Sequence, residues 1–453
     1  MSQQFESNSP RAELPMRLTR LRVKNFRSIA DIDIPLSPLT VLVGPNGSGK
    51  SNVVDALRFV RDVFARGLGQ AVKKWGGINV VKRWSSGKEG VSIGVTMHWP
   101  QLNRTDKFTT SEGVKEVPVE FPTATVHYDF TINTSETNLP TVTSEFLVVE
   151  IPDSDTGGVE ILRKDRELKI RLGNLAWNQV RQSGVASVAA RVRNEDTELW
   201  SPKGLMEGVR NHNYGSTELE NQPWFLHFWY KALGFTSMTL DQLFYSFDLK
   251  DLSQFQSVAE STPFDEKGIN LSAVLRHLFQ NNGPDWDSLQ FALRRAIAGF
   301  STLKVEEVGD YLSTKLIYQT DTTQPRTSYL GQESDGTIRM LGLLAALYQD
   351  PAQPFLSIEE PEANIHPGAL AVLAGVLDEA SLRSQVLVTT HSPDLLDHLP
   401  VESFLVVEKI GDTTHVGSLD ASQVASVRKR LFTPGELLRM EGLQRQTTPD
   451  TAA

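Results

Sequence analysis

A short glycine-rich segment constrains the fold of this chain more than any other feature. Residues 44–51 read Gly-Pro-Asn-Gly-Ser-Gly-Lys-Ser, which matches the phosphate-binding pattern G-x-x-x-x-G-K-S without a break. An apolar run precedes it, Leu39 to Val43, and a helical pattern of apolar residues follows it: Val53, Leu57, Val60 and Phe64. A strand, a glycine turn and a helix in this order predict a loop that binds the phosphates of a nucleoside triphosphate.

The residue types of this loop indicate its chemistry. The glycines allow the backbone to curl so that its N–H groups face a phosphate. We expect Lys50 to reach the β- and γ-phosphates and Ser51 to hold Mg²⁺. The predicted nucleotide contacts are Asn46, Gly47, Ser48, Gly49, Lys50, Ser51 and Asn52. ATP and Mg²⁺ are the predicted cofactors; the alternative is a chance glycine turn before a helix. No Asn-Lys-x-Asp guanine motif is present, which disfavours a GTPase.

Length and composition narrow the class of protein. A chain of 453 residues exceeds one ordinary core, so two or three lobes are expected. No apolar run approaches the roughly 18 residues of a membrane span, and residues 1–16 lack the apolar part of a signal peptide. The absence of cysteine excludes disulfides, thiolate zinc sites and a cysteine nucleophile. These features predict a cytoplasmic protein without a membrane segment.

The pattern along the chain predicts five segments. Residues 1–16 and 444–453 are polar and are expected to be disordered ends. Residues 17–173 carry the glycine-rich loop and alternating runs typical of antiparallel strands. Helical patterns dominate 174–288, whereas strands and helices alternate over 289–443. The predicted fold class is α/β: a P-loop NTPase with a mixed sheet, in which an antiparallel β lobe accompanies a parallel core, and a mainly helical insertion.

A second candidate site lies where an apolar strand ends in two acids. The run Phe355 to Ile358 is followed by Glu359 and Glu360. In phosphate-loop ATPases the strand beside the loop strand ends in this way. We therefore expect Glu359 to orient the Mg²⁺ shell and Glu360 to polarise the attacking water. The alternative is an acidic pair on the protein surface.

Two further polar segments are expected at the same site. His391 follows the apolar run Val386 to Val388, and an imidazole at the tip of a buried strand can contact a γ-phosphate. The alternative is a structural histidine. Ser334, Asp335 and Gly336 precede an apolar helical pattern, where they also fit a plain helix N-cap. Their place shortly before the acidic strand makes them candidates for the site.

Two kinds of segment bear on nucleic-acid binding. Residues 224–230 are rich in aromatic side chains and form either a base-stacking surface or a helix packed on all sides. Four basic clusters either touch a phosphate backbone or are solvated surface: Lys73-Lys74, Lys82-Arg83, Arg163-Lys164-Arg166 and Arg428-Lys429-Arg430. A net charge of −10 argues against a surface coated for nucleic acid but allows a local patch, so DNA stays a candidate partner.

The order of these motifs resembles that of the ABC-type ATPases of the RecF, SMC and OLD group, and more narrowly of the RecF-like AAA family ATPases of bacterial defence loci. The resemblance covers residues 17–100 and 300–410 and says little about 150–290. Its motifs are Asn25-Phe26-Arg27-Ser28, Gly44 to Asn52, Ser334 to Thr337, Glu359 to Glu362 with His366-Pro367, and Thr390 to Ser392. It implies a head of the ABC/RecF-like type.

The resemblance also implies roles for single positions. The segment Ser334 to Gly336 would belong to a signature motif, whose helix N-terminus caps the γ-phosphate of ATP bound to another copy. Arg27 resembles the basic residue that approaches the nucleotide in SMC-like heads. Glu359 replaces the aspartate usual in ABC proteins, and His366 stands where many of them carry the aspartate of the D-loop. A Q-loop glutamine is not identified.

The leading hypothesis is a Mg²⁺-dependent ATPase whose ATP-bound heads form a homodimer or higher oligomer, which hydrolysis opens. Its expected output is control of a separate effector, such as a nuclease, or engagement of DNA, in antiviral defence, DNA repair or DNA maintenance. A rival is an ATP-locked scaffold with negligible turnover that holds or inhibits a partner protein.

Other members of this group are disfavoured by what the sequence lacks. There is no cysteine hook or long coiled coil, which argues against an SMC-type tether. Only about 45 residues follow the strand predicted over Ser403 to Val407, fewer than a Toprim nuclease domain of the OLD kind needs. An ABC transporter subunit is disfavoured by the missing Q-loop and the long insertion.

Overall fold

The computed structural model describes residues 16–110, 113–121, 123–134, 140–150, 159–164, 167–172, 242–254, 256–258, 263–281, 283–319 and 324–446. The predicted disordered ends and the aromatic block 224–230 therefore lie almost wholly outside the described residues, as does most of the predicted insertion. The chain forms two compact units: residues 1–35 with 59–240, and residues 36–58 with 241–453. Of the predicted boundaries, 173/174 lies outside the described residues and 288/289 falls inside helix α11 (Pro284–Ala296). The five-segment division therefore stays a prediction.

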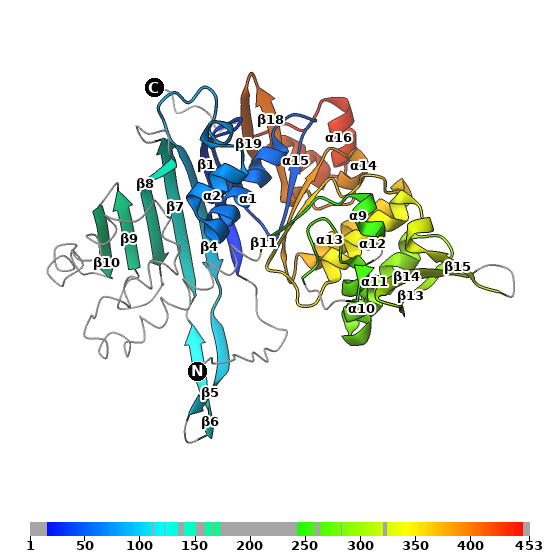
Figure 1. Cartoon of the computed structure of the whole chain (residues 1–453). Coiled ribbons are helices and arrows are strands. Elements are labelled where there is room, and N and C mark those ends of the chain that lie inside the picture. Colours follow the sequence, from blue (N-terminus) through cyan, green and yellow to red (C-terminus); the bar gives the residue numbers. More distant parts are fainter. Residues whose placement is uncertain are drawn as a thin grey trace. The chain divides into compact units, whose positions relative to one another are not determined.

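The first unit is built on an antiparallel sheet (Figure 1). Its strand order is β10-β9-β8-β7-β4-β1-β2, and neighbours run antiparallel throughout. Buried and half-buried residues alternate along β7, as in a strand with one face on a core. Its strands are β1 (Arg17–Phe26), β2 (Ile29–Pro35), β4 (Val91–Trp99), β7 (Ala124–Thr134), β8 (Pro140–Glu150), β9 (Val159–Lys164) and β10 (Glu167–Leu172). This is the antiparallel lobe that the alternating sequence pattern predicted.

Smaller elements complete the first unit. β5 (Leu102–Thr110) and β6 (Gly113–Phe121) pair as a separate hairpin. The short helices α2 (Leu68–Lys74) and α3 (Ile78–Val81) follow the long helix α1 (Lys50–Arg66), whose residues from Phe59 onwards belong to this unit.

The second unit carries the parallel core. Its strand order is β19-β18-β3-β17-β16-β11, and all neighbours are parallel except the antiparallel pair β18–β19. The strands are β3 (Leu39–Val43), β11 (Gln242–Tyr245), β16 (Phe355–Glu359), β17 (Gln385–Thr390), β18 (Phe404–Ile410) and β19 (Thr413–Ser418). Every residue of β3 and β17 is buried, as expected for central strands of a parallel sheet that is covered on both faces. The mixed sheet type predicted from the sequence is confirmed.

Helices and a small sheet surround this core. α12 is buried from Ile338 to Tyr348 and, together with α13, contributes much of the main apolar cluster. The helices are α9 (Leu249–Ser253), α10 (Leu271–Asn281), α11 (Pro284–Ala296), α12 (Asp335–Tyr348), α13 (Pro367–Ala380), α14 (Pro393–Leu396), α15 (Ala421–Arg428) and α16 (Pro434–Met440). The small antiparallel sheet consists of β12 (Gln256–Ser257), β13 (Phe300–Val308), β14 (Tyr311–Tyr318) and β15 (Arg326–Tyr329). None of the helices that the structure describes has the length and apolarity needed to cross a membrane.

Two features of the parallel core correct the expectations. The acidic strand β16 does not neighbour the loop strand β3, because β17 lies between them. The strand tips still coincide, since Val43 is in register with Thr390, and Thr389 with Glu359. The strand predicted over Ser403 to Val407 is also not the last one: after a turn at Gly411, β19 folds back along it.

Candidate nucleotide-binding site

The glycine-rich loop joins the end of β3 to the start of α1 and is packed tightly from one side. Gly47 and Gly49 have φ angles of 77° and 106°, which residues with a side chain rarely adopt. A Cβ atom on Gly49 would lie 2.1 Å from the Oγ1 of Thr414 on β19. Thr414 also donates a hydrogen bond to the carbonyl of Ser48 at 3.0 Å. The strand β19 therefore fixes the backbone path of the loop.

Lys50 is buried and folds back over the loop. Its Nζ donates to the carbonyls of Gly44 at 2.7 Å and Pro45 at 3.1 Å. Burial lowers the pKa of Lys50, and the negative charges of Glu360 and Glu362 oppose that shift. A cation is thus held at the centre of a curled glycine loop, which is the cradle that a polyphosphate needs. The predicted contacts Asn46 to Asn52 all lie in this loop or in the first turn of α1.

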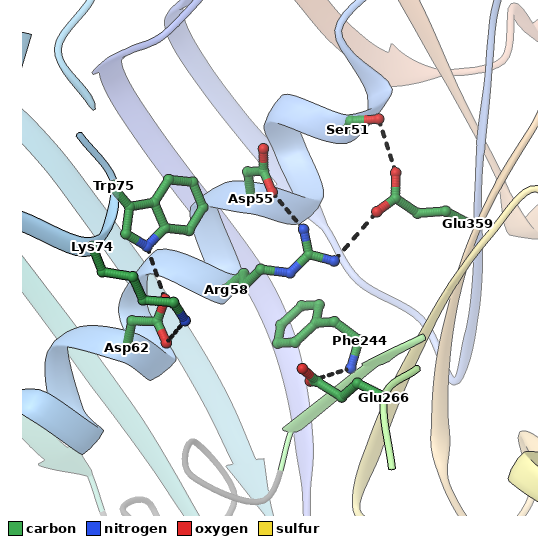
Figure 2. A network of polar contacts seen from close by, with 9 residues as sticks. All are labelled: Ser51, Asp55, Arg58, Asp62, Lys74, Trp75, Phe244, Glu266 and Glu359. Carbon is green, nitrogen blue, oxygen red and sulfur yellow. Dashed lines mark hydrogen bonds and ion pairs between the residues drawn. The ribbon is translucent and has the colours of Figure 1, made fainter. Parts of the chain in front are cut away.

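The structure brings Ser51 and Glu359 together. Ser51 Oγ donates to Glu359 Oε2 at 2.9 Å, and the other carboxylate oxygen accepts from Arg58 at 3.3 Å (Figure 2). Hydroxyl and carboxylate oxygens are the donors that Mg²⁺ prefers, and Mg²⁺ usually has one or two carboxylates plus substrate phosphates as ligands. Within the described ranges no three His, Cys, Asp or Glu side chains gather as a metal cluster. The residues present thus fit Mg²⁺ held jointly with a phosphate.

Glu360 leaves the strand and lies beside His391. Its backbone N–H donates to the carbonyl of Thr389 at 2.9 Å, and its φ is 45°. One carboxylate oxygen lies 3.1 Å from His391 Nδ1, and the two side chains are 42% and 44% exposed. A carboxylate and an imidazole, both open to water, therefore stand together next to the strand that carries Glu359.

Arg339 on α12 holds the acidic strand end from the protein interior. Its guanidinium donates to the carbonyls of Glu360 at 2.9 Å, Glu359 at 3.3 Å and Phe247 at 3.3 Å. Burial lowers the pKa of Arg339, and the charges of Glu362 and Glu360 oppose that shift. Sequence reasoning missed this residue. The available signal was a single charged side chain inside the apolar run 338–348.

Ser334 caps α12 through its side chain, which accepts from the Thr337 N–H at 3.3 Å. Ser334 and Asp335 are exposed. A Cβ on Gly336 would lie 2.5 Å from the carbonyl of Asn364, so close packing within the chain requires this glycine. The N-cap alternative describes the local structure correctly. A contact with ATP on another copy stays a prediction.

Arg27 lies in the first unit, where its guanidinium carbon is 4.9 Å from the centre of the Trp75 ring. Its φ of 50° is also unusual for a residue with a side chain. The predicted approach of Arg27 to the nucleotide stays a prediction.

Two of the basic clusters are partly engaged in ion pairs. Lys74 donates to both carboxylate oxygens of Asp62 at 2.8 Å (Figure 2), and Arg428 lies 2.9 Å from Glu402. These contacts agree with solvated surface at those two positions. The side chains of the cluster at 163–166 lie outside the described residues.

The fold and the site define a mixed α/β P-loop NTPase: a glycine loop follows a buried parallel strand, and paired acids stand at the end of another strand of the same core. Comparisons with known proteins agree. Residues 231–397 match a family model described as "AAA domain, putative AbiEii toxin, Type IV TA system", and residues 16–88 match one described as "AAA ATPase domain".

Curated relatives share short segments with this chain. It is 58% identical over 43 residues to an OLD nuclease of Thermus scotoductus, a match that covers 10% of this chain and 8% of that protein. It is 34% identical over 92 residues to the DNA replication and repair protein RecF of Erwinia tasmaniensis (18% and 24%). It is 57% identical over 47 residues to the chromosome partition protein Smc of Halothermothrix orenii (10% and 4%). The chain thus spans between 4% and 24% of the length of these relatives.

Solved structures of SMC heads align with this chain at low TM-scores and low identity. An Smc head bound to the C-terminal winged-helix domain of ScpA covers 90% of this chain and 99% of its own, with a TM-score of 0.46 and 13% identity. The SMC head of Thermotoga maritima covers 89% and 100%, with a TM-score of 0.36 and 14% identity. The family-model and relative matches confirm the resemblance to the RecF, Smc and OLD ATPases.

Proposed function

We propose that the protein is a Mg²⁺-dependent ATPase whose heads close around ATP. The observation that carries this proposal is the 2.9 Å hydrogen bond from Ser51 to Glu359, which joins the phosphate-loop helix to the acidic strand. Glu360, the next residue, lies with His391 in a position open to water. The matches to AAA ATPase domains and to segments of RecF and OLD proteins support an ATPase.

Each part of the site has a proposed task. The loop N–H groups and Lys50 hold the phosphates of ATP. When ATP binds, Lys50 replaces its contacts with the carbonyls of Gly44 and Pro45 by contacts with the phosphates. Ser51 and Glu359 supply oxygen ligands to Mg²⁺, which neutralises phosphate charge when bound. Glu360 orients and activates the attacking water as a general base, and His391 contacts the γ-phosphate. Arg339 fixes the backbone that presents both acids.

A composite site across two copies extends the proposal. The exposed Ser334 and Asp335 begin a helix of 14 residues, whose N-terminus suits the γ-phosphate of ATP bound to a partner copy. Closure would then control a separate effector or engage DNA, in the cytoplasm. The OLD nuclease relative favours a nuclease as effector, the RecF relative favours DNA, and the toxin–antitoxin description of one matched family favours phage defence.

Steady-state ATP hydrolysis by the wild type and by Lys50→Ala, with and without DNA, tests the function. We expect Mg²⁺-dependent turnover in the wild type that Lys50→Ala abolishes, because the variant lacks the cation that neutralises the β- and γ-phosphates. Tight ATP binding without turnover would instead identify an ATP-locked scaffold. Equal hydrolysis by a correctly folded Lys50→Ala variant would refute the assignment of the loop.

A further inference from the structure

Arg58 lies between two acids, Asp55 and Glu359, of which Glu359 is a proposed Mg²⁺ ligand. Ser51, Asp55 and Arg58 share one face of α1, because steps of four and three residues follow the helix period. Arg58 donates to Asp55 Oδ1 at 2.7 Å through one nitrogen and to Glu359 Oε1 at 3.3 Å through another (Figure 2). The side chains of Asp55, Arg58 and Glu359 are 11%, 23% and 24% exposed, so water screens these contacts only in part.

An aromatic ring also contacts the guanidinium of Arg58. Its Cζ lies 5.1 Å from the ring centre of Phe244 on β11 (Figure 2). Phe244 is fixed in turn, because its backbone N–H donates to Glu266 Oε1 at 2.8 Å and its strand pairs with β16. A planar guanidinium that meets a ring and two carboxylates has a defined orientation, which a lysine at the same place would not have.

We propose that Arg58 is a positioning residue that holds Glu359 in the geometry that Mg²⁺ binding requires, and that Asp55 and Phe244 orient Arg58; this inference rests on the proposed ATPase function. One oxygen of Glu359 is directed to Ser51 and the other is fixed by Arg58. Without Arg58, a side chain with three rotatable bonds would keep only one of its two anchors. Because Asp55 balances the charge of Arg58, the pair orients Glu359 without adding net positive charge beside the metal site.

The test compares the affinity for a fluorescent ATP analogue in Mg²⁺ with that in EDTA, using the full-length chain. The ratio of the two affinities measures what Mg²⁺ contributes to binding. We expect Arg58→Gln to lower this ratio about ten-fold and to leave the affinity in EDTA unchanged, because groups that orient metal ligands typically contribute about 10–100-fold. Phe244→Leu should also lower the ratio, by a smaller factor. Arg58→Lys should have a ratio between those of Arg58→Gln and the wild type.

Arg66→Gln is the matched control. Arg66 lies on the same helix, but its acidic neighbour is Asp62 at 3.8 Å, so its removal should leave the ratio at the wild-type value. An unchanged ratio in a folded Arg58→Gln variant would overturn the inference, and so would an equal loss of affinity in Mg²⁺ and in EDTA. If Arg58→Gln does not fold, Asp55→Asn/Arg58→Gln removes both charges and takes the same test. A wild type whose affinity does not depend on Mg²⁺ would contradict the proposed function itself, whatever Arg58 does.

Discussion

Glu360 has a backbone conformation that residues with a side chain seldom adopt. Its φ of 45° lies in the left-handed region, which costs roughly 1–2 kcal/mol for such residues. The neighbours compensate: the N–H of Glu360 donates to Thr389, and its carbonyl accepts from Arg339 at 2.9 Å. Backbone strain that the surroundings enforce is common at functional sites. The Glu360 carboxylate lies 3.1 Å from His391, whereas the Glu359 carboxylate accepts from Ser51, so the two neighbouring acids make different contacts.

Arg339 should contribute to both stability and turnover. Arg339→Met fills a similar volume but leaves three carbonyls without their donor, those of Phe247, Glu359 and Glu360. We expect a loss of about 1–3 kcal/mol in the free energy of unfolding, since leaving a buried acceptor such as the Phe247 carbonyl unsatisfied costs about that much and the carbonyls of Glu359 and Glu360 are only partly buried. The rate of ATP hydrolysis should fall more than the affinity for ATP, because the backbone that presents Glu360 loses its anchor. Urea unfolding and kinetic assays measure the two effects; a Met variant with wild-type values in both would exclude this role.

At the scale of elements, the sequence predicts what local pattern determines. The glycine loop, the buried run of β3 and the apolar run of β16 can each be recognised from a few adjacent residues. The helix at Ser334 is equally local, because its N-cap and apolar positions are adjacent in the chain. The fold class and the identity of the candidate residues therefore follow from the sequence.

Contacts between distant segments could not be predicted in the same way. Arg58 and Glu359 are 301 positions apart in the sequence, and Thr414 and Ser48 are 366 apart. Neither pair has a local signature, because each exists only after the parallel strands are ordered. The place of β17 between β3 and β16 is likewise a property of the whole sheet. Sequence reasoning consequently found the groups proposed to bind ATP and missed those that position them.

The strand β19 should support the phosphate loop through a single hydroxyl. Thr414→Val keeps the shape of the side chain but removes the hydrogen bond to the buried carbonyl of Ser48. We expect a loss of about 1–3 kcal/mol in the free energy of unfolding, together with weaker ATP binding, because the loop loses a fixed point beside Gly49. Thr413→Val, one residue earlier on the same strand, is the control and should change ATP affinity little. Equal ATP affinity in the Thr414→Val variant and the wild type would show that the loop does not need this support.

At the scale of the whole molecule, the proposed composite site requires two copies. A Lys50→Ala chain has a defective loop and an intact Ser334, whereas a Ser334→Arg chain has the reverse. In an equal mixture that associates at random, about half of the dimers are heterodimers, and each heterodimer has one intact site out of two. The mixture should therefore contain about a quarter of the wild-type number of sites. Mixing should restore ATP-dependent association and some hydrolysis that neither variant shows alone. Verified heterodimers without any recovery would count against a site shared between copies.

The most direct test replaces each of the two neighbouring acids, Glu359 and Glu360, and measures ATP hydrolysis together with dimer formation. Glu360→Gln should still bind Mg²⁺ and ATP through Lys50, Ser51 and Glu359, but it should hydrolyse ATP about 10²–10⁴-fold more slowly, because it lacks the general base. Glu359→Gln should instead weaken the Mg²⁺-dependent part of ATP binding, since that carboxylate contacts Ser51.

Size-exclusion chromatography with light scattering, in the presence of Mg²⁺ and ATP, combined with a hydrolysis assay, measures both properties on one sample. We predict that Glu360→Gln accumulates as a stable dimer with slow turnover, and that replacing Mg²⁺ by EDTA returns it to the mass of the nucleotide-free protein. Wild-type turnover by Glu360→Gln, with no gain in mass, would contradict the proposed base and the ATP-driven closure together.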